Sequence, residues 1–137
     1  MYKLPIILVT SGLLLSSASA ATIYVPDNHA KIQDAIVASS NGDTVIVRPG
    51  TYVENIDFLG KAITLQSEQG PDVTVIDGGN PSDPNDRSVV VFENGEGPDS
   101  VIEGFTLTNG LGTDIYSGGG AYGHGAGIFC RDSSPTI

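Results

Sequence analysis

The sequence is poor in cysteine and in basic residues. Cys130 is the one cysteine, so the chain has no internal disulfide and its fold must rest on packing. Lysine and arginine together number 6, against 16 acidic residues. This deficit argues against a basic nucleic-acid-binding patch and against attraction to anionic membranes. The acidic residues are scattered along the chain, which is typical of a solvated surface.

Residues 1–20 have the pattern of an export signal. Lys3 supplies a positive start, an apolar run follows from Leu4 to Leu15, and Ala18-Ser19-Ala20 has the small-x-small form that signal peptidase accepts. The run is shorter than the roughly 20 apolar residues that cross a bilayer. We therefore predict cleavage after Ala20, no membrane span after cleavage, and a secreted, periplasmic or cell-surface protein.

The mature chain, from residue 21, opens with a predicted strand and one amphipathic helix of about three turns, which together occupy residues 21–43. Ile32, Ala35 and Ile36 recur at the spacing of one helical face. Asp27 or Asn28 is the expected N-cap, and Gly42 is expected at the left-handed position after the last turn. No second helical pattern follows, so we expect this helix to cover the apolar end of the β-structure.

After Gly42 the chain consists of short β-branched runs separated by turns rich in Gly, Pro, Asn and Asp. Two-residue hairpin signals between the runs are mostly missing, which favours a parallel solenoid over an antiparallel sandwich. The spacing of the runs suggests coils of roughly 20–25 residues. The predicted strands are Thr44–Val47, Ala62–Leu65, Val73–Ile76, Ser88–Phe92, Ser100–Ile102 and Phe105–Thr108.

Five short sequence motifs follow one another between residues 32 and 78. They are Ile32-Gln33-Asp34-Ala35-Ile36, Gly42-Asp43-Thr44-Val45, Pro49-Gly50-Thr51-Tyr52-Val53-Glu54, Ile63-Thr64-Leu65 and Val75-Ile76-Asp77-Gly78. The series resembles the N-terminal part of pectin-lyase-like right-handed parallel β-helix repeat proteins. The resemblance implies an all-β fold, a single-stranded right-handed parallel β-helix with an N-terminal capping helix, in which residues 44–137 are the first coils. In that family the Tyr and Glu at the positions of Tyr52 and Glu54 belong to the opening coil and not to the catalytic set.

The C-terminal residues suggest that the sequence is a piece of a longer repeat. The resembling proteins show a Gly-Gly-Gly segment followed by regular coils, matched here by Gly118–Gly120 and by the stretches Gly125–Cys130 and Ser133–Ile137. We expect the chain to be C-terminally incomplete, because it ends inside a predicted strand and has no polar terminal coil. The aspartate groupings that polysaccharide esterases and hydrolases of this fold use are not found in these residues.

Three further features of the sequence are candidate sites: an aspartate-containing loop, a histidine and the cysteine. The loop that contains Asp83, Asp86 and Arg87 has an Asp-x-x-Asp pair, but too few ligands for calcium by itself, so we interpret it as a solvated loop. His124 stands alone between glycines, which is weak evidence for a metal site. Cys130 has no neighbouring base, so we interpret it as a small buried apolar residue. No catalytic residue, cofactor site or metal site is therefore predicted.

Two functions remain open. The first is a non-catalytic exported module whose partner is a polysaccharide or a cell-surface glycan. The second is the N-terminal part of a polysaccharide-active enzyme similar to pectate lyase, pectin methylesterase or polygalacturonase, whose catalytic coils would lie downstream. The first is favoured for these residues, because they contain no assembled catalytic group and because the repeat resembles non-catalytic exported proteins.

Overall fold

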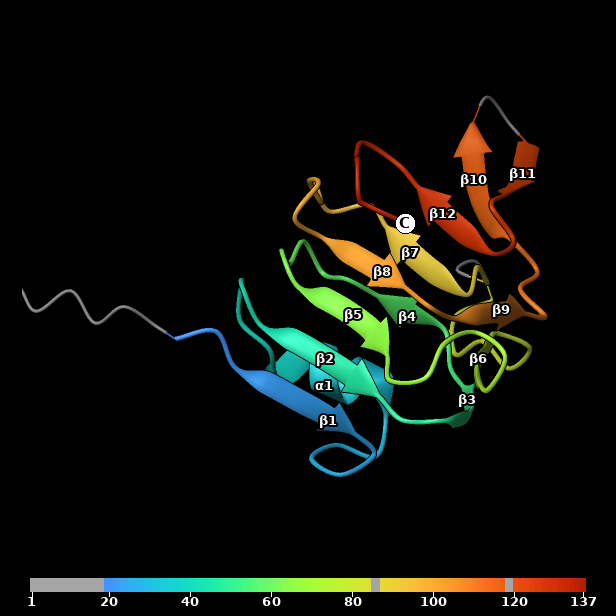
Figure 1. Ribbon diagram of the computed structural model, residues 1–137. Coiled ribbons are helices and arrows are strands. Elements are labelled where there is room, and N and C mark those ends of the chain that lie inside the picture. The colour runs from blue at the N-terminus through green and yellow to red at the C-terminus, as the bar shows by residue number, and fades with distance from the viewer. Residues whose placement is uncertain (1–18, 85–86, 118–119) are drawn as a thin grey trace, which may run out of the picture.

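The computed structural model describes residues 19–84, 87–117 and 120–137, and leaves out the side chains of residues 115–122. Most of the predicted export signal, residues 1–18, lies outside the described residues, so export stays a prediction. The described part contains one helix, α1 (Ile32–Ala38), and twelve strands. The chain runs through a succession of short strands joined by turns (Figure 1).

Three of the four sheets are parallel. The largest has the strand order β1-β2-β5-β8, and its strands are Thr22–Val25, Thr44–Val47, Thr64–Ser67 and Val101–Glu103. The second has the order β3-β6-β9, with strands Gly50–Val53, Thr74–Asp77 and Thr106–Thr108. The third has the order β12-β7-β4, with strands Ile128–Cys130, Val90–Phe92 and Ile56–Asp57. The fourth is an antiparallel pair, β10 (Thr113–Ser117) and β11 (Gly120–His124), which projects beside β12 in Figure 1.

Register separates an apolar inner face from a polar outer face in the first sheet. Val45 pairs with Leu65 and Leu65 pairs with Ile102, and all three side chains are buried. On the opposite face, the threonines that begin β1, β2 and β5 pair in register and are partly exposed or exposed. Burial alternates in the same way along Ile63-Thr64-Leu65-Gln66, because strand side chains point to opposite faces in turn.

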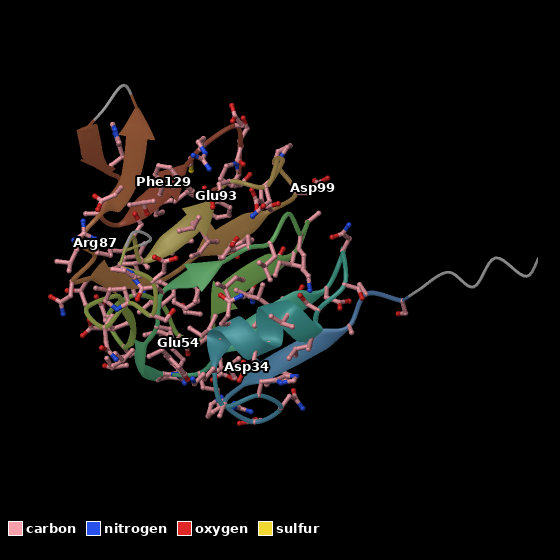
Figure 2. The ribbon with its side chains drawn as sticks, turned by 180° about the vertical axis from the view of Figure 1, so that it is seen from behind. Asp34, Glu54, Arg87, Glu93, Asp99 and Phe129 are labelled. Carbon is pink, nitrogen blue, oxygen red and sulfur yellow. The ribbon has the colours of Figure 1, made fainter. Side chains whose placement is uncertain are left out.

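One apolar core is shared by the three parallel sheets and α1. Within it, Phe58 and Phe92 are each 0% exposed and have ring centroids 4.4 Å apart. Ile32, Ala35 and Ile36 of α1 are each 0% exposed, as the helical pattern predicted. Burying each of these isoleucines stabilises the fold by about 1.5–3 kcal/mol relative to an exposed position. In Figure 2, which shows the molecule from behind, α1 lies across one end of the stacked strands.

Charged side chains from other segments hold both ends of α1. At the N-terminal end, the two carboxylate oxygens of Glu54 accept hydrogen bonds from the backbone N–H groups of Ile32 and Gln33. At the other end, the Lys61 ammonium donates to the carbonyl oxygens of Ile36, Val37 and Ser39, each at 2.7 Å. A negative charge at the N-terminus and a positive charge at the C-terminus both complement the helix dipole. They also satisfy backbone groups that a short helix leaves without partners.

Two edge strands are covered by side chains. The carboxamide of Gln33 donates to the carbonyl oxygen of Asp57 in β4 and accepts from the N–H of the same residue. Asn28 pairs with Tyr24 of β1 in a similar way, through its side-chain oxygen and its backbone N–H. Both β4 and β1 end their sheets. These bonds occupy backbone groups that would otherwise be open to pairing with another chain.

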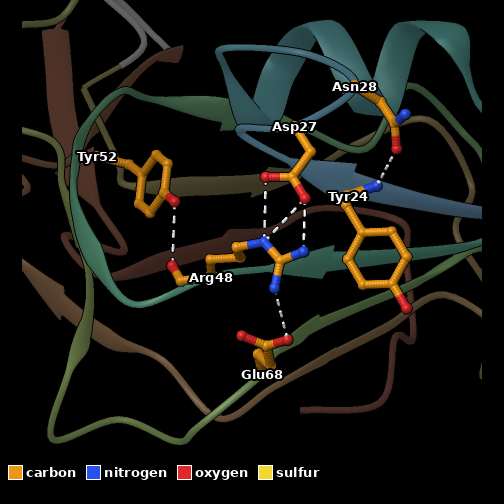
Figure 3. A network of polar contacts seen from close by, with 6 residues as sticks. All are labelled: Tyr24, Asp27, Asn28, Arg48, Tyr52 and Glu68. Atoms are coloured by element: carbon orange, nitrogen blue, oxygen red, sulfur yellow. Dashed lines mark hydrogen bonds and ion pairs between the residues drawn. The ribbon is translucent and has the colours of Figure 1, made fainter.

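A ladder of charges lies where β1, β2 and β5 end (Figure 3). Arg48 binds the carboxylate of Asp27 with two guanidinium nitrogens and that of Glu68 at 3.0 Å. The Arg48 hydrogen bond lowers the pKa of Asp27, and the guanidinium also lies over the Tyr24 ring. The ion pairs are exposed, so we expect about 1 kcal/mol or less from each.

Glu96 joins three turns that are distant in the sequence. It is 2% exposed, and its carboxylate accepts hydrogen bonds from the N–H groups of Gly60 and Asn94 and from the hydroxyl of Ser133. Its carbonyl oxygen accepts from the N–H of Ser134. Burial by itself would raise the pKa of Glu96, but these hydrogen bonds outweigh it and the pKa is lowered.

The predicted fold class is wrong. The described strands do not form one closed single-stranded solenoid, that is, an all-β right-handed parallel β-helix. They form separate small sheets, of which the β10–β11 sheet is antiparallel. The physical reason is that apolar alternation predicts where strands lie, whereas pairing and closure depend on the segments between them. Gly120–His124, from the segment expected to lead into regular coils, instead pairs with Thr113–Ser117 as an antiparallel hairpin.

The ends of the predicted helix also need correction. The helix has 7 residues, not about three turns, and Lys31 occupies the N-cap position without a side-chain cap. Asp27 and Asn28 are bonded elsewhere, and Glu54 supplies the acceptor that a local cap would have supplied. Gly42 does have a left-handed φ of 93°, but it lies in the turn beyond the C-cap residue Ser39.

Replacing Lys61 with methionine tests how much the Lys61 ammonium stabilises the C-terminal end of α1. The variant keeps most of the apolar stem and removes the ammonium from three helix-terminal carbonyls. We expect the free energy of unfolding to fall by about 1–2 kcal/mol. Urea unfolding followed by circular dichroism measures this. Lys31→Met is the matched control, because Lys31 is exposed, and an equal loss in both variants would contradict the role given to Lys61.

Glu96→Gln tests the buried carboxylate. A lowered folded-state pKa contributes stability above the ordinary carboxyl pKa, and this contribution is lost as the pH falls through the folded-state pKa. The variant should be about 2 kcal/mol less stable at neutral pH, and its stability should fall less than that of the original chain on acidification. Thermal unfolding over a pH series measures both. Parallel pH profiles of the two proteins would contradict the prediction.

Candidate functional site

A polar groove lies between α1, the β3–β4 corner and the loop that follows β6. It consists of two adjoining hollows that share Gln33, Asn55 and Ser82. The larger hollow has a volume of about 340 Å³, which is within the ~300–1,000 Å³ of many small-molecule sites. We call this feature the polar groove. Its lining residues are Lys31, Gln33, Asp34, Val53, Glu54, Asn55, Ile56, Asp57, Asn80, Ser82, Asp83 and Val91.

Asn55 connects the floor of the polar groove to its wall. Its side-chain nitrogen donates to the carbonyl oxygens of Gly78 and Ser88, at 3.2 and 2.9 Å. These two residues stand at the start and the end of the loop, so one amide holds both of its ends. The side-chain oxygen of Asn55 is buried and has no hydrogen-bond partner in the described structure.

Close packing of the backbone keeps the loop in this position. Gly78 approaches Val89 and Asn55 so closely that an added Cβ would lie 2.9 Å from a Val89 methyl group. Ser82 and Asp83 of the loop line the smaller hollow together with Val91 of β7, which is 1% exposed. Ser82, Asp83 and Pro84 of the insertion are exposed, as expected for a solvated loop, and Ser82 and Asp83 also line the polar groove.

Acidic side chains dominate the electrostatics of the polar groove. Asp34, Glu54, Asp57 and Asp83 line it, and Lys31 is the one basic residue in its lining. Figure 2 shows Asp34 and Glu54 close to one another at α1. Glu54 is bound to helix N–H groups and Asp57 accepts from the N–H of Leu59, so these two carboxylates have set positions. Asp34 is exposed on the helix.

The chemistry available in the polar groove is hydrogen bonding and charge recognition. Its exposed side chains are carboxylates, an amide, a hydroxyl and an ammonium. Within residues 19–84, 87–117 and 120–137 there is no group of three or more His, Cys, Asp or Glu side chains arranged to hold a metal ion. The groove therefore offers hydrogen-bonding and charged groups to a polar molecule.

The loop residues noted in the sequence have different positions. Asp83 lines the polar groove, and Asp86 lies outside the described residues. Arg87 points away, forming an ion pair of 2.9 Å with Asp114 at the base of the hairpin. The sequence interpretation missed Gln33, Asn55 and Ser82 as groove residues. Polar turn-forming residues were the available signal, but no local pattern shows that this loop lines a hollow together with a helix about 50 positions earlier.

Two other candidates lie at the opposite end of the molecule. The prediction that Cys130 is buried is wrong, because its residue is exposed beside a shallow hollow that His124 also lines. Partial burial of the thiol, with the nearby Glu96 charge, raises the pKa of Cys130, which makes it a poorer nucleophile at neutral pH. Tyr52 belongs to the fold, since its hydroxyl donates to the carbonyl oxygen of Arg48.

In the described part of the chain, the structure has no helix with the length and apolar character needed to cross a membrane. Comparison with protein-family models gives no match, and comparisons with curated proteins and with solved structures give none either. The resemblance to pectin-lyase-like proteins therefore stays a prediction that rests on the sequence motifs.

Asn55→Ala tests how the groove wall is held. Removing the amide leaves the carbonyls of Gly78 and Ser88 without this donor, so we expect a loss of about 1–3 kcal/mol and a looser loop. Limited trypsin digestion should then cut after Arg87 faster than in the original chain, with the fragments identified by mass spectrometry. Asn80→Ala, a change at an exposed position of the same loop, is the control. Equal cleavage rates in the two variants would show that Asn55 does not hold the wall.

Proposed function

We propose that the protein is a non-catalytic exported module that binds a glycan in the polar groove. The observation that carries the proposal is that three separate segments bring hydrogen-bonding side chains to one hollow surface. Asp34 comes from α1, Asn55 from the β3–β4 corner, and Asn80 and Ser82 from the loop after β6. Amide, carboxylate and hydroxyl groups of this kind match the many hydroxyl donors and acceptors of a sugar chain.

Some groove residues stabilise the fold and others are exposed to a ligand, and this separation supports binding. Gln33 and Glu54 hold α1 and the strands, so their polar atoms are committed to the fold. Asn80, Ser82 and Asp34 are exposed at the rim, where a ligand could contact them without disturbing the core. Because Gln33 and Glu54 are already fixed by hydrogen bonds, less conformational entropy is lost when a ligand binds.

The enzyme alternative would require an assembled catalytic pair. The carboxylates that the groove positions most firmly, Glu54 and Asp57, accept hydrogen bonds from backbone N–H groups. They therefore stabilise the fold, which supports a binding role for the groove. The proposed partner remains a polysaccharide or a cell-surface glycan.

An Asn80→Ala/Ser82→Ala double variant tests the proposal. Screening the original chain against a panel of neutral, cationic and anionic oligosaccharides, by ligand-observed NMR, identifies a binder. The double variant should bind that oligosaccharide about tenfold more weakly, since each lost hydrogen bond is worth about 1 kcal/mol. Its unfolding transition should be unchanged. Gln69→Ala, exposed on another turn, should bind as the original does. Absence of binding across the panel would refute the proposal.

A further inference from the structure

We infer that the polar groove prefers a glycan with protonated amino groups, such as an unacetylated glucosamine oligomer, and rejects polyuronates. This inference rests on the proposed function and specifies its ligand class. It also departs from what the sequence resemblance implies, because the enzymes named there act on acidic polysaccharides.

Acidic side chains outnumber basic ones in the lining of the polar groove. Asp34, Glu54, Asp57 and Asp83 contribute four carboxylates, against the single ammonium of Lys31. The hydrogen bonds that the Glu54 carboxylate accepts from Ile32 and Gln33 come from neutral N–H groups, which leave its negative charge in place. A uronate carboxylate in this groove would meet like charges at close range.

Two of these carboxylates, Glu54 and Asp57, are held in place by the fold. Glu54 cannot move without releasing α1, and Asp57 lies in an edge strand whose backbone is bonded to Gln33. The negative field is therefore part of the folded structure and does not depend on the rotamers of exposed side chains alone. The whole chain strengthens it at longer range, with a formal net charge of −10.

The chemistry of the ligand follows from these charges. An ammonium group offers three donors and a positive charge, and the exposed carboxylate of Asp34 is an acceptor of opposite sign. The hydroxyl groups of the same sugar ring can pair with Asn80 and Ser82 at the rim. An N-acetylated sugar keeps the hydroxyls but loses the charge, so comparing the two isolates the electrostatic part of recognition.

The experiment is a calorimetric titration of the purified chain with three oligosaccharides of equal length. These are oligomers of glucosamine, of N-acetylglucosamine and of galacturonic acid, at mildly acidic pH where the amino groups are protonated. We expect the glucosamine oligomer to bind about threefold or more tighter than its acetylated counterpart, a factor that fits exposed ion pairs. The preference should shrink at high salt. The galacturonate oligomer should not bind.

Comparing Asp34→Asn with Asp72→Asn tests whether the preference comes from the polar groove or from the net charge of the chain. Both variants change the net charge equally, but Asp72 is exposed on the turn before β6 and does not line the polar groove. Asp34→Asn should reduce the preference for the amino sugar, because it should weaken binding of the glucosamine oligomer more than binding of the acetylated oligomer. Asp34→Glu should keep the preference, and Asp72→Asn should behave as the original.

The outcomes separate this inference from the proposed function. If none of the three oligosaccharides or the wider panel binds, the proposed function and this inference both fail. Equal or tighter binding of the acetylated or the galacturonate oligomer would overturn the inference and leave glycan binding in place. An equal effect of Asp34→Asn and Asp72→Asn would also overturn it, because the preference would then come from net charge and not from the groove.

Discussion

The covering of the apolar core by α1 is the interaction on which the other features depend. Parallel strands carry their apolar side chains inward, so the end of the stack exposes both core and strand edges unless something lies across it. A helix of 7 residues is too short to be stable by itself in water. It persists because three buried side chains and two opposite charges, Glu54 and Lys61, bind it to the strands.

This arrangement also creates the polar groove. Glu54 and Gln33 bind the start of α1 to the β3–β4 corner, which leaves a hollow along the side of the helix. Asn55, next in the chain, binds the loop that closes the hollow. The same short segment therefore stabilises the fold and shapes the surface. A change at Glu54 would alter both, whereas Asn80 and Ser82 can be changed at the surface alone.

Much of the local structure could be predicted from the sequence, and less of the tertiary arrangement. The buried face of α1 and the strand Thr44–Val47 follow directly from apolar periodicity. Several other strands are shifted by one or two residues, as with Thr64–Ser67, because a strand ends where its hydrogen-bonded partner ends. The single closed solenoid was wrong, since the turns and the insertion change which strands meet. Cys130 was expected inside and lies exposed.

The sequence by itself determined the acidity, the absence of internal disulfides, the helix near residue 35 and the positions of most of the described strands. These are properties of composition and of patterns over a few neighbouring residues. Only the tertiary structure decided that Glu54 caps a helix 21 positions earlier and that the loop of Ser82 faces Gln33 across a hollow. Such contacts join residues with no pattern in common, because they depend on the three-dimensional path of the chain. The candidate site consists of such contacts.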